Sequence, residues 1–264
     1  MPAELITDDQ PRIKFQAERQ GQAPYVGSNA SLADLADLMA ELEASGVIPT
    51  LNDGLAAGNC AIAVIAVESA AHSSSSFSAS TAGAVAAAGD RRKGKQHDCP
   101  PPKQPEGMWV SRSGKQPGVL MHPSDFVLVT DFDRGSWSAR YVSSLEEARP
   151  TSDSPLHAAA LLSDAQAAYG WSEKPLVAVH GHALAEGAGL DLAQRLGFPI
   201  SHEATLFSTP EDLRELEQLF AAHPYPQHRC YIRKGHGFFL LGRSVGEVRQ
   251  NFRELILPYL EDLS

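Results

Sequence analysis

The sequence predicts a globular protein in which helices and strands share one core, of the three-layer α/β or the α+β class. Apolar residues make up 43% of the 264 residues, which is enough for a sizeable core. Amphipathic helical segments and short apolar strands follow one another without strict βαβ alternation, and no internal repeat is visible. At roughly 100–200 residues per domain, the length allows one large domain or two small ones.

The first predicted elements are a helix and a buried strand. In SLADLADLMAELEAS (31–45) the leucines recur at steps of three and four residues, with Ser31 as the expected N-cap and Gly46 as the stop. The segment CAIAVIAV (60–67) is short, apolar and preceded by turn residues. We therefore expect a strand that is covered on both faces.

The composition changes between residues 68 and 107, which are rich in Ser, Ala, Gly and Pro. Only Phe77 and Val85 represent the large aliphatic and aromatic residues there. Such a segment cannot bury enough apolar surface to become ordered, so we expect a disordered insertion. Its basic centre, DRRKGKQHDCPPPKQ (90–104), is either solvated linker or a place where an acidic partner binds.

The rest of the chain predicts further strands and helices in mixed order. Trp109 and Val110 indicate a strand before a Ser-Gly turn. Pro155 and Pro210 suit the first turns of two helices, and Thr209 suits an N-cap. The expected strands, hairpin and helices are 125–133 (strand), 151–170 (helix), 174–182 (buried strand), 209–220 (helix), 230–244 (hairpin) and 244–263 (closing helix).

Charge and cysteine content restrict the partners and the compartment. The chain carries 22 Lys and Arg against 32 Asp and Glu, a net charge of −10, which excludes a general attraction to nucleic acid or to an anionic membrane. No apolar stretch approaches the ~18 residues needed to span a bilayer, and no secretory signal is readable. Three widely spaced cysteines fit a reducing interior, so we expect a cytoplasmic protein.

Three histidines at expected strand ends form a candidate metal site. His180 and His182 are two residues apart on a strand, so both side chains point to the same face. His236 lies between two glycines, directly before the apolar run Phe238–Leu241. Neutral imidazoles suit zinc, iron, nickel or copper, and three of them leave coordination positions open. The alternative is a set of partly exposed polar residues at strand ends.

Five short motifs in a fixed order give the chain a resemblance to a known family. They are Gly58-Asn59 before a strand, the Ser113-Gly114 turn, PTSDSPLH (150–157), VHGH (179–182) and KGHG (234–237). In this order they resemble the class II aldolase/adducin family over about residues 31–260, interrupted by the insertion at 68–107. The resemblance implies one domain over 1–264, with a three-layer α/β/α fold around a mixed, largely antiparallel sheet. It also implies a homotetramer with sites between subunits.

The resemblance assigns roles to these residues. It makes His180, His182 and His236 ligands of a divalent metal, with Zn²⁺ as first choice and Mn²⁺, Fe²⁺ or Co²⁺ as alternatives. Asp153 stands where family aldolases carry a catalytic glutamate and where the epimerase branch has aspartate. The residues matching the family's phosphate pocket are small donors, and Lys115 after the turn would add charge. These phosphate-binding candidates are Gly58, Asn59, Ser113, Gly114, Thr151 and Ser152.

The function implied is that of a metal-dependent lyase acting on a small ketose phosphate or related hydroxy-carbonyl compound. The metal would stabilise an enediolate while Asp153 moves a proton. Because enediolate stabilisation serves several reactions and Asp replaces Glu at 153, epimerase, dehydratase or decarboxylase chemistry is the alternative. A non-catalytic, adducin-like binding module is a further alternative, against which the complete histidine trio argues. Since the expected site residues run from Gly58 to His236, the sequence favours one domain over two.

Overall fold

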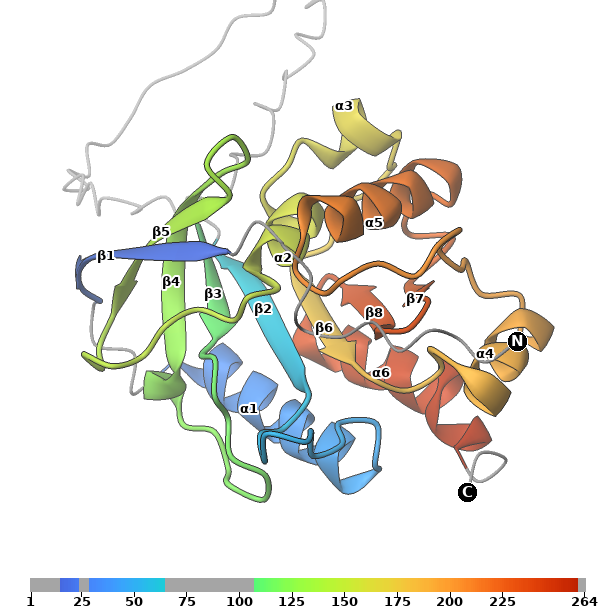
Figure 1. Cartoon of the computed structure of the whole chain (residues 1–264), viewed down its shortest axis with the longest axis horizontal. Helices are drawn as coiled ribbons and strands as arrows, with labels where there is room; N and C mark the ends of the chain where they lie inside the picture. Colours follow the sequence, from blue (N-terminus) through green and yellow to red (C-terminus); the bar gives the residue numbers. More distant parts are fainter. Residues whose placement is uncertain (1–14, 24–28, 65–106, 261–264) are drawn as a thin grey trace, which may run out of the picture.

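The computed structural model describes residues 15–23, 29–64 and 107–260, and its strands form a single sheet (Figure 1). The strand order is β1-β5-β4-β3-β2-β6-β8-β7. Only the edge pair β1–β5 is parallel, and the other neighbours are antiparallel. The strands are β1 (Gln16–Gln22), β2 (Gly58–Val64), β3 (Gly107–Ser111), β4 (Phe126–Asp133), β5 (Ser138–Ser143), β6 (Val177–Gly181), β7 (Cys230–Arg233) and β8 (Gly237–Gly242).

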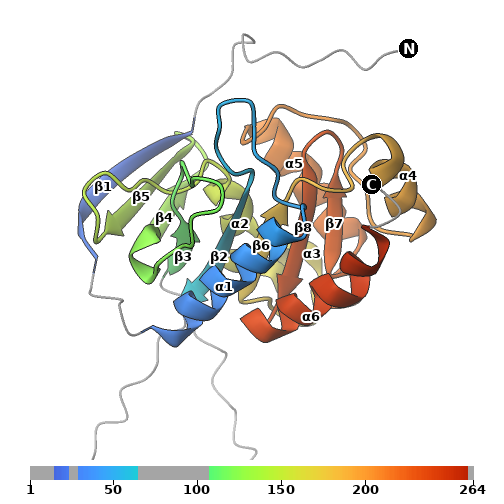
Figure 2. The same ribbon diagram turned by 90° about the horizontal axis from the view of Figure 1, so that it is seen from below.

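Helices cover both faces of this sheet, so the domain has three layers (Figure 2). The side of α1 and α6 has its own apolar cluster, and α2 and α5 pack into the cluster on the opposite side. The mixed, largely antiparallel α/β/α architecture predicted from the motifs is confirmed. The helices are α1 (Ala30–Ala44), α2 (Ser154–Leu161), α3 (Ala165–Tyr169), α4 (Gly187–Arg195), α5 (Pro210–Ala222) and α6 (Val245–Leu255), with short 3-10 turns at Pro123–Asp125 and Leu257–Tyr259.

The central strands are apolar on both faces because both faces are covered. In β2, Cys60 packs on the α1/α6 side and Ala61 on the α2/α5 side. Phe238 and Phe239 divide in the same way in β8. Successive side chains of a strand point to opposite faces, so a strand buried on both sides reads as a continuous apolar run.

Helix boundaries differ from the sequence prediction at three places. The closing helix, expected over 244–263, ends at Leu255 and is followed by the 3-10 turn Leu257–Tyr259. The first helix starts at Ala30, and its N-cap is Asn29, whose Oδ1 accepts hydrogen bonds from the backbone of Ser31 and Leu32; Ser31 as N-cap was wrong. Asn29 has extended backbone angles, which places its amide oxygen over the first turn. The expected helix 151–170 is two helices, α2 and α3. Ser163 Oγ bonds back to the Ala159 carbonyl, and Asp164 Oδ1 accepts from Ala167 N at the start of α3, at 3.2 Å.

Some parts of the chain were less well predicted from the sequence than the central strands. The expected insertion 68–107 lies outside the described residues except for Gly107, which belongs to β3 and pairs with Val64. Strand β1 is polar and has no apolar pattern, and the two glycines of α4 lower its helix propensity, so the sequence did not predict either element. The hairpin of β7 and β8 and the capped helix at Thr209 follow the prediction.

The sheet brings the distant motifs to one edge. Asn59 at the start of β2 pairs with His180 at the end of β6, and His180 pairs with Phe239 in β8. Ser111 ends β3 beside the start of β2, and its carbonyl accepts from Thr151 N. Five segments that are far apart in sequence therefore meet where these strands begin or end. Within the described ranges, no helix is both long and apolar enough to cross a bilayer.

Candidate metal centre

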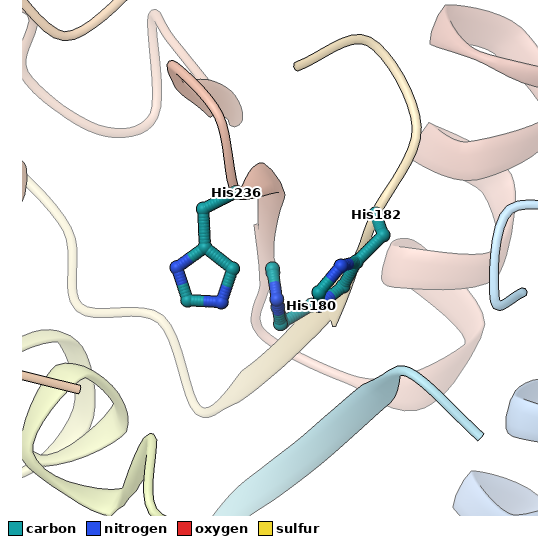
Figure 3. A group of neighbouring side chains, drawn as sticks. All are labelled: His180, His182 and His236. Carbon is teal, nitrogen blue, oxygen red and sulfur yellow. The ribbon is translucent and has the colours of Figure 1, made fainter. Parts of the chain in front are cut away.

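Three imidazoles converge at this edge of the sheet (Figure 3). His180 and His182 come from the end of β6, and His236 comes from the turn between β7 and β8. One ring nitrogen from each residue lies within 4.8 Å of the other two. The ring centroids are 4.5 to 5.1 Å apart. This is a ligand set of one chemical type, with room at its centre for a metal ion.

Glycines allow the two strands that carry the histidines to approach each other. Gly237 has a φ of +147°, and a Cβ there would lie 2.0 Å from the carbonyl oxygen of Gly181. A Cβ on Gly181 would lie 2.6 Å from the ring of Phe238. Both distances are far below van der Waals contact. The close approach that sets His236 beside His180 therefore requires glycine at both positions.

The two ring nitrogens of His180 have different surroundings. His180 is fully buried, and its Nδ1 lies 2.8 Å from the Phe238 carbonyl oxygen, which holds the donor proton on Nδ1. Its Nε2 is buried and has no hydrogen-bond partner among the described residues. Burial lowers the pKa of His180 well below its usual value, and His182 acts in the same direction, so the ring is neutral. A neutral imidazole with one nitrogen held by a carbonyl and the other free is the usual metal-ligating form.

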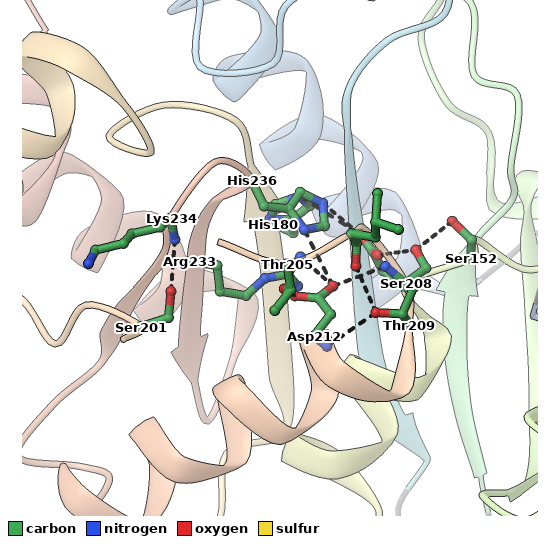
Figure 4. A network of polar contacts seen from close by, with 12 residues as sticks. Ser152, His180, Ser201, Thr205, Ser208, Thr209, Asp212, Arg233, Lys234 and His236 are labelled. Carbon is green, nitrogen blue, oxygen red and sulfur yellow. Dashed lines mark hydrogen bonds and ion pairs between the residues drawn. The ribbon is translucent and has the colours of Figure 1, made fainter. Parts of the chain in front are cut away.

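His236 lies between two carboxylates. Its Nε2 is 3.8 Å from Asp153 Oδ2, and its Nδ1 is 3.5 Å from Asp212 Oδ2. Asp212 is buried and accepts a hydrogen bond from Arg233 Nη2 at 2.9 Å (Figure 4). Carboxylates behind a ligating histidine commonly orient the ring and raise its basicity. The Asp212–Arg233 pair therefore stands where an outer shell of a metal site would be.

Asp153 faces the same centre. Its Oδ2 lies 3.7 Å from His180 Nε2 and 3.8 Å from His236 Nε2. Ligand atoms about 2.0–2.1 Å from a tetrahedral zinc ion lie roughly 3.4 Å from one another. The carboxylate is thus close enough either to complete the ligand set or to exchange a proton with a molecule bound there. The three histidines and this aspartate fit a divalent cation.

Asp153 is ionised despite its burial. Burial alone would raise its pKa, but the charge of the nearby Arg233 and hydrogen bonds from Asn59 and Ser208 outweigh burial and lower the pKa to about 2. Ser208 Oγ donates to Oδ1 at 2.7 Å. Asn59 Nδ2 donates to Oδ2 at 2.8 Å. The carboxylate is therefore an anion held at both oxygens.

Asn59 is bonded at both ends of its amide. Besides the bond to Asp153, its Oδ1 lies 2.6 Å from Nε2 of His157, which is fully buried. Burial lowers the pKa of His157 to about 4, so this imidazole is neutral at pH 7. The two bonds engage the amide of Asn59, one of the predicted phosphate-binding residues, with side chains of the protein.

The other predicted phosphate-binding residues lie near this network or in the turn beside it. Gly58 starts β2, where a Cβ would lie 2.8 Å from Ile48. Thr151 is buried, while Ser152 is exposed and its Oγ lies 2.9 Å from Ser208 Oγ.

The turn that carries Ser113 and Gly114 joins the Thr151 segment. Ser113 N donates to the carbonyl of Arg149 at 2.8 Å, and Gly114 has a φ of +79° with open space where a Cβ would be. Lys115 forms an ion pair with Glu43 on α1, so its charge anchors this turn.

Several residues of the centre were not predicted from the sequence. They are Phe207, Ser208, Asp212 and Arg233. Phe207 is 43% exposed and stacks on His236, with centroids 4.1 Å apart. Ser208 has a φ of +57°, which turns its hydroxyl toward Asp153. Of these four residues, only Arg233 could have been noticed in the sequence, because it is a cation at the end of the apolar run CYI, two residues before Gly235 of the KGHG motif.

Comparisons with known proteins support the fold. No protein-family model and no curated protein sequence matches this chain. Among solved structures, a sugar-phosphate aldolase from Thermotoga maritima superposes with a TM-score of 0.53 and 12% identity, over 89% of this chain and 94% of that one. An L-fuculose-1-phosphate aldolase from Thermus thermophilus gives 0.47 and 16%, over 89% and 94%.

A third structure is the N-terminal class II aldolase domain of a conserved protein from Thermoplasma acidophilum. It gives a TM-score of 0.48 and 12% identity, over 92% of this chain and 96% of that one. The structural likeness shows that the chain has the class II aldolase fold, as its motifs predicted.

Proposed function

We propose that this chain is a metal-dependent lyase of the class II aldolase type. Its substrate would be a small ketose phosphate or a related hydroxy-carbonyl compound, in which it cleaves or forms a C–C bond. The observation that carries the proposal is the convergence of three histidine nitrogens within 4.8 Å, with an ionised carboxylate 3.7 Å from one of them. The fold supports it, because the sugar-phosphate aldolase of Thermotoga maritima shares that fold.

His180, His182 and His236 would hold a divalent cation, with Zn²⁺ as first choice. The buried, unpartnered Nε2 of His180, counted among the described residues, supports this assignment because an orphaned buried acceptor is costly without a ligand. A bound cation supplies Lewis acidity for negative charge that develops on substrate oxygens. An all-imidazole set suits zinc, and Mn²⁺, Fe²⁺ and Co²⁺ remain alternatives.

Asp153 would accept and return the proton. It is ionised at neutral pH, so it can take a proton, and its pKa of about 2 makes it a weak base. A weak base removes a proton only from a group whose acidity is strongly raised, and a dication next to the substrate oxygens raises it. The low pKa of Asp153 and its position beside the three histidines are therefore both consistent with proton transfer at the proposed metal centre.

The phosphate group would lie among Gly58, Asn59, Ser113, Gly114, Thr151 and Ser152. Small residues let backbone and hydroxyl donors approach an anion closely. The exposed Ser152 is the member of this set bonded through Ser208 to Asp153, so phosphate and carboxylate binding would be adjacent. The amide of Asn59 is bonded at both ends, so it would bind phosphate only by giving up one of those two hydrogen bonds.

The second candidate function is epimerase, dehydratase or decarboxylase chemistry at the same site. The aspartate at 153 favours it, because the side chain is one methylene shorter than the expected glutamate and reaches less far toward a substrate carbon. A panel of pentulose and deoxyhexulose phosphates separates the two, since only an aldolase releases a triose phosphate. A non-catalytic, adducin-like module is the third candidate and would turn over none of them.

The first experiment is metal analysis of the purified protein by mass spectrometry. We expect one divalent cation per chain, lost in His180→Ala and His236→Ala. His223→Ala is the matched control, because His223 lies outside the centre, at the end of α5. Wild-type protein that retains no stoichiometric metal, or the same metal content in His180→Ala, would contradict the proposal.

The proposal extends to assembly and domain organisation. The chain would act as one domain over 1–264, as its single sheet suggests, and as a cytoplasmic homotetramer that binds no nucleic acid and no membrane. Light scattering coupled to gel filtration tests the tetramer, and a monomer at micromolar concentration would contradict it.

A further inference from the structure

Three buried side chains form a continuous hydrogen-bonded chain behind the candidate metal centre. His157 Nε2 lies 2.6 Å from Asn59 Oδ1, and Asn59 Nδ2 lies 2.8 Å from Asp153 Oδ2. The exposed fractions are 0% for His157, 8% for Asn59 and 4% for Asp153. The chain connects helix α2 to strand β2 and back again, across more than 90 residues of sequence.

The chemistry of these groups gives the chain one direction. The amide oxygen of Asn59 can only accept, so His157 must donate through an Nε2–H. The amide nitrogen of Asn59 then points at the carboxylate of Asp153, which can only accept. If the amide were rotated by 180°, two acceptors would face each other at Asp153. The carboxylate of Asp153 therefore fixes which end of Asn59 faces it, and the N–H of His157 binds the other end of the amide and holds it in place.

Asp153 depends on this chain for its orientation. It occupies the N-cap position of α2, yet its side chain makes no capping hydrogen bond within the described helix. Its Oδ1 is held by Ser208, and its Oδ2, held by Asn59, is the oxygen that faces His180 and His236. A residue that would ordinarily cap a helix is instead turned toward the histidines.

We propose that His157 and Asn59 are positioning residues, which hold Oδ2 of Asp153 toward the metal and the substrate. The proposal rests on the function proposed above for Asp153. It also gives Asn59 a role that does not require contact with phosphate. His157 acts only through Asn59, because its own ring lies behind the amide and packs on Phe239, with centroids 5.1 Å apart.

Two substitutions at 157 separate positioning from packing. His157→Phe keeps a ring against Phe239 and removes the donor, whereas His157→Gln supplies an N–H in place of the ring. We expect His157→Phe to lower kcat about 10-fold to 100-fold with little change in KM, as for outer-shell partners of metal sites. His157→Gln should recover most of that loss. If His157 had a purely structural role, His157→Gln would lose more kcat than His157→Phe, since Gln packs less well on Phe239.

A second readout does not depend on turnover. In the Co²⁺-substituted protein, the visible absorption spectrum reports the geometry and donors around the metal. We expect Asp153→Asn to change that spectrum, and His157→Phe to change it in the same direction with one Co²⁺ still bound per chain. If His157→Phe does not fold, Asn59→Ser removes the same connection from its other end and should give the same change.

The outcomes distinguish this inference from the function on which it rests. A wild type that turns over no substrate of the panel counts against the lyase, while the Co²⁺ spectra still decide the positioning role. An unchanged spectrum in His157→Phe and Asn59→Ser would overturn the inference, as would an unchanged spectrum in Asp153→Asn. With turnover, equal kcat losses for His157→Phe and His157→Gln would overturn it too.

Discussion

At the scale of single residues, the candidate centre joins charges that would be costly if unpaired. Arg233 is 2% exposed and Asp212 is 1% exposed, and they form an ion pair at 2.9 Å. Asp212 also accepts from the backbone N–H of Ser208 and from Thr205 Oγ1. Among the described residues, Nε and Nη1 of Arg233 have no partner, and the one carboxylate there that accepts a hydrogen bond from this cation is that of Asp212. Asp212 is therefore important for stability, because its carboxylate is buried against Arg233.

Replacing Asp212 tests that dependence. We expect Asp212→Asn to lower the free energy of unfolding by about 3–5 kcal/mol, because the buried guanidinium of Arg233 would lose the carboxylate with which it forms its ion pair. We also expect Zn²⁺ affinity to fall about 10-fold to 100-fold, because His236 loses the carboxylate behind its Nδ1. Urea unfolding and competition with a zinc chelator measure the two effects. Arg214→Gln, which breaks an exposed pair with Glu211, is the control and should cost less than about 1 kcal/mol.

Replacing Asp153 tests its proposed role in proton transfer. Asp153→Asn keeps the size of the side chain and removes its ability to accept a proton, so we expect kcat to fall about 10²-fold to 10⁴-fold. The histidines remain, so metal content should stay close to one ion per chain. Steady-state kinetics on the substrate identified from the panel, with metal analysis of the same samples, provides the measurement. Turnover within twofold of wild type would exclude Asp153 as the proton carrier.

At the scale of elements, the centre depends on how closely β6 and β8 approach each other. Their register pairs His180 with Phe239, and the turn before β8 brings His236 back over β6. The backbone of Gly237 lies against that of Gly181 with no space for a side chain. The strand pair therefore forms the scaffold of the candidate metal site, and its geometry is encoded by two glycines as much as by the histidines.

A pair of Gly→Ala variants tests this scaffold. Gly237→Ala would place a Cβ 2.0 Å from the Gly181 carbonyl oxygen at a φ of +147°, so we expect a loss of at least about 2 kcal/mol of stability and reduced metal content. Gly246→Ala lies on the exposed first turn of α6, where the nearest atom is 3.8 Å away. It should stabilise the protein by about 0.4–1 kcal/mol. Thermal unfolding compares them, and a Gly237→Ala protein as stable as wild type would refute the close approach.

At the scale of the whole molecule, the net charge of −10 and an anionic substrate are compatible. The chain as a whole repels anions, but the centre contains Arg233 and would hold a dication. Electrostatic attraction at short range in a buried site outweighs a diffuse field that salt screens. A sugar phosphate would thus bind at a place where the local charge opposes that of the chain.

Buried neutral histidines predict how stability depends on pH. The pKa of His157 is lowered to about 4, against 6.5 in the unfolded chain, so between these values the unfolded chain binds a proton that the folded one does not. Stability is then complete above pH 6.5 and falls as pH drops toward 4. Asp153, with its pKa lowered to about 2, contributes stability that is complete above its unfolded value of 3.8 and is lost only as the pH falls below that value.

We expect the metal-free protein to lose about 2 kcal/mol between pH 7.5 and pH 5 through His157 alone. Burial lowers the pKa of His180 and His182 as well, so the total loss should be larger. Urea unfolding at both pH values measures it. In His157→Phe the loss should be smaller by the contribution of His157, and an equal loss in both proteins would contradict the assignment.

The sequence by itself determined the fold class, the order of most central elements and the histidine trio. These features are encoded locally: apolar periods specify helices and strands, and His-x-His and Gly-His-Gly are short contiguous patterns. It did not reveal β1, α4 or the break between α2 and α3, because a polar edge strand, a glycine-containing helix and a Ser-Asp turn carry weak local signals.

Tertiary structure alone decided which residues work together. Asn59 reads locally as part of a phosphate loop, yet the pairing of β2 with β6 and the packing of α2 place its amide between His157 and Asp153. The site around His236 and Asp153 also gathers side chains from β7, α5 and the loop before α5. These are Arg233, Asp212 and Ser208, which meet only because those segments converge. Hydrogen bonds reach only about 3 Å, so such a partnership depends on how distant segments pack and leaves no pattern in the sequence.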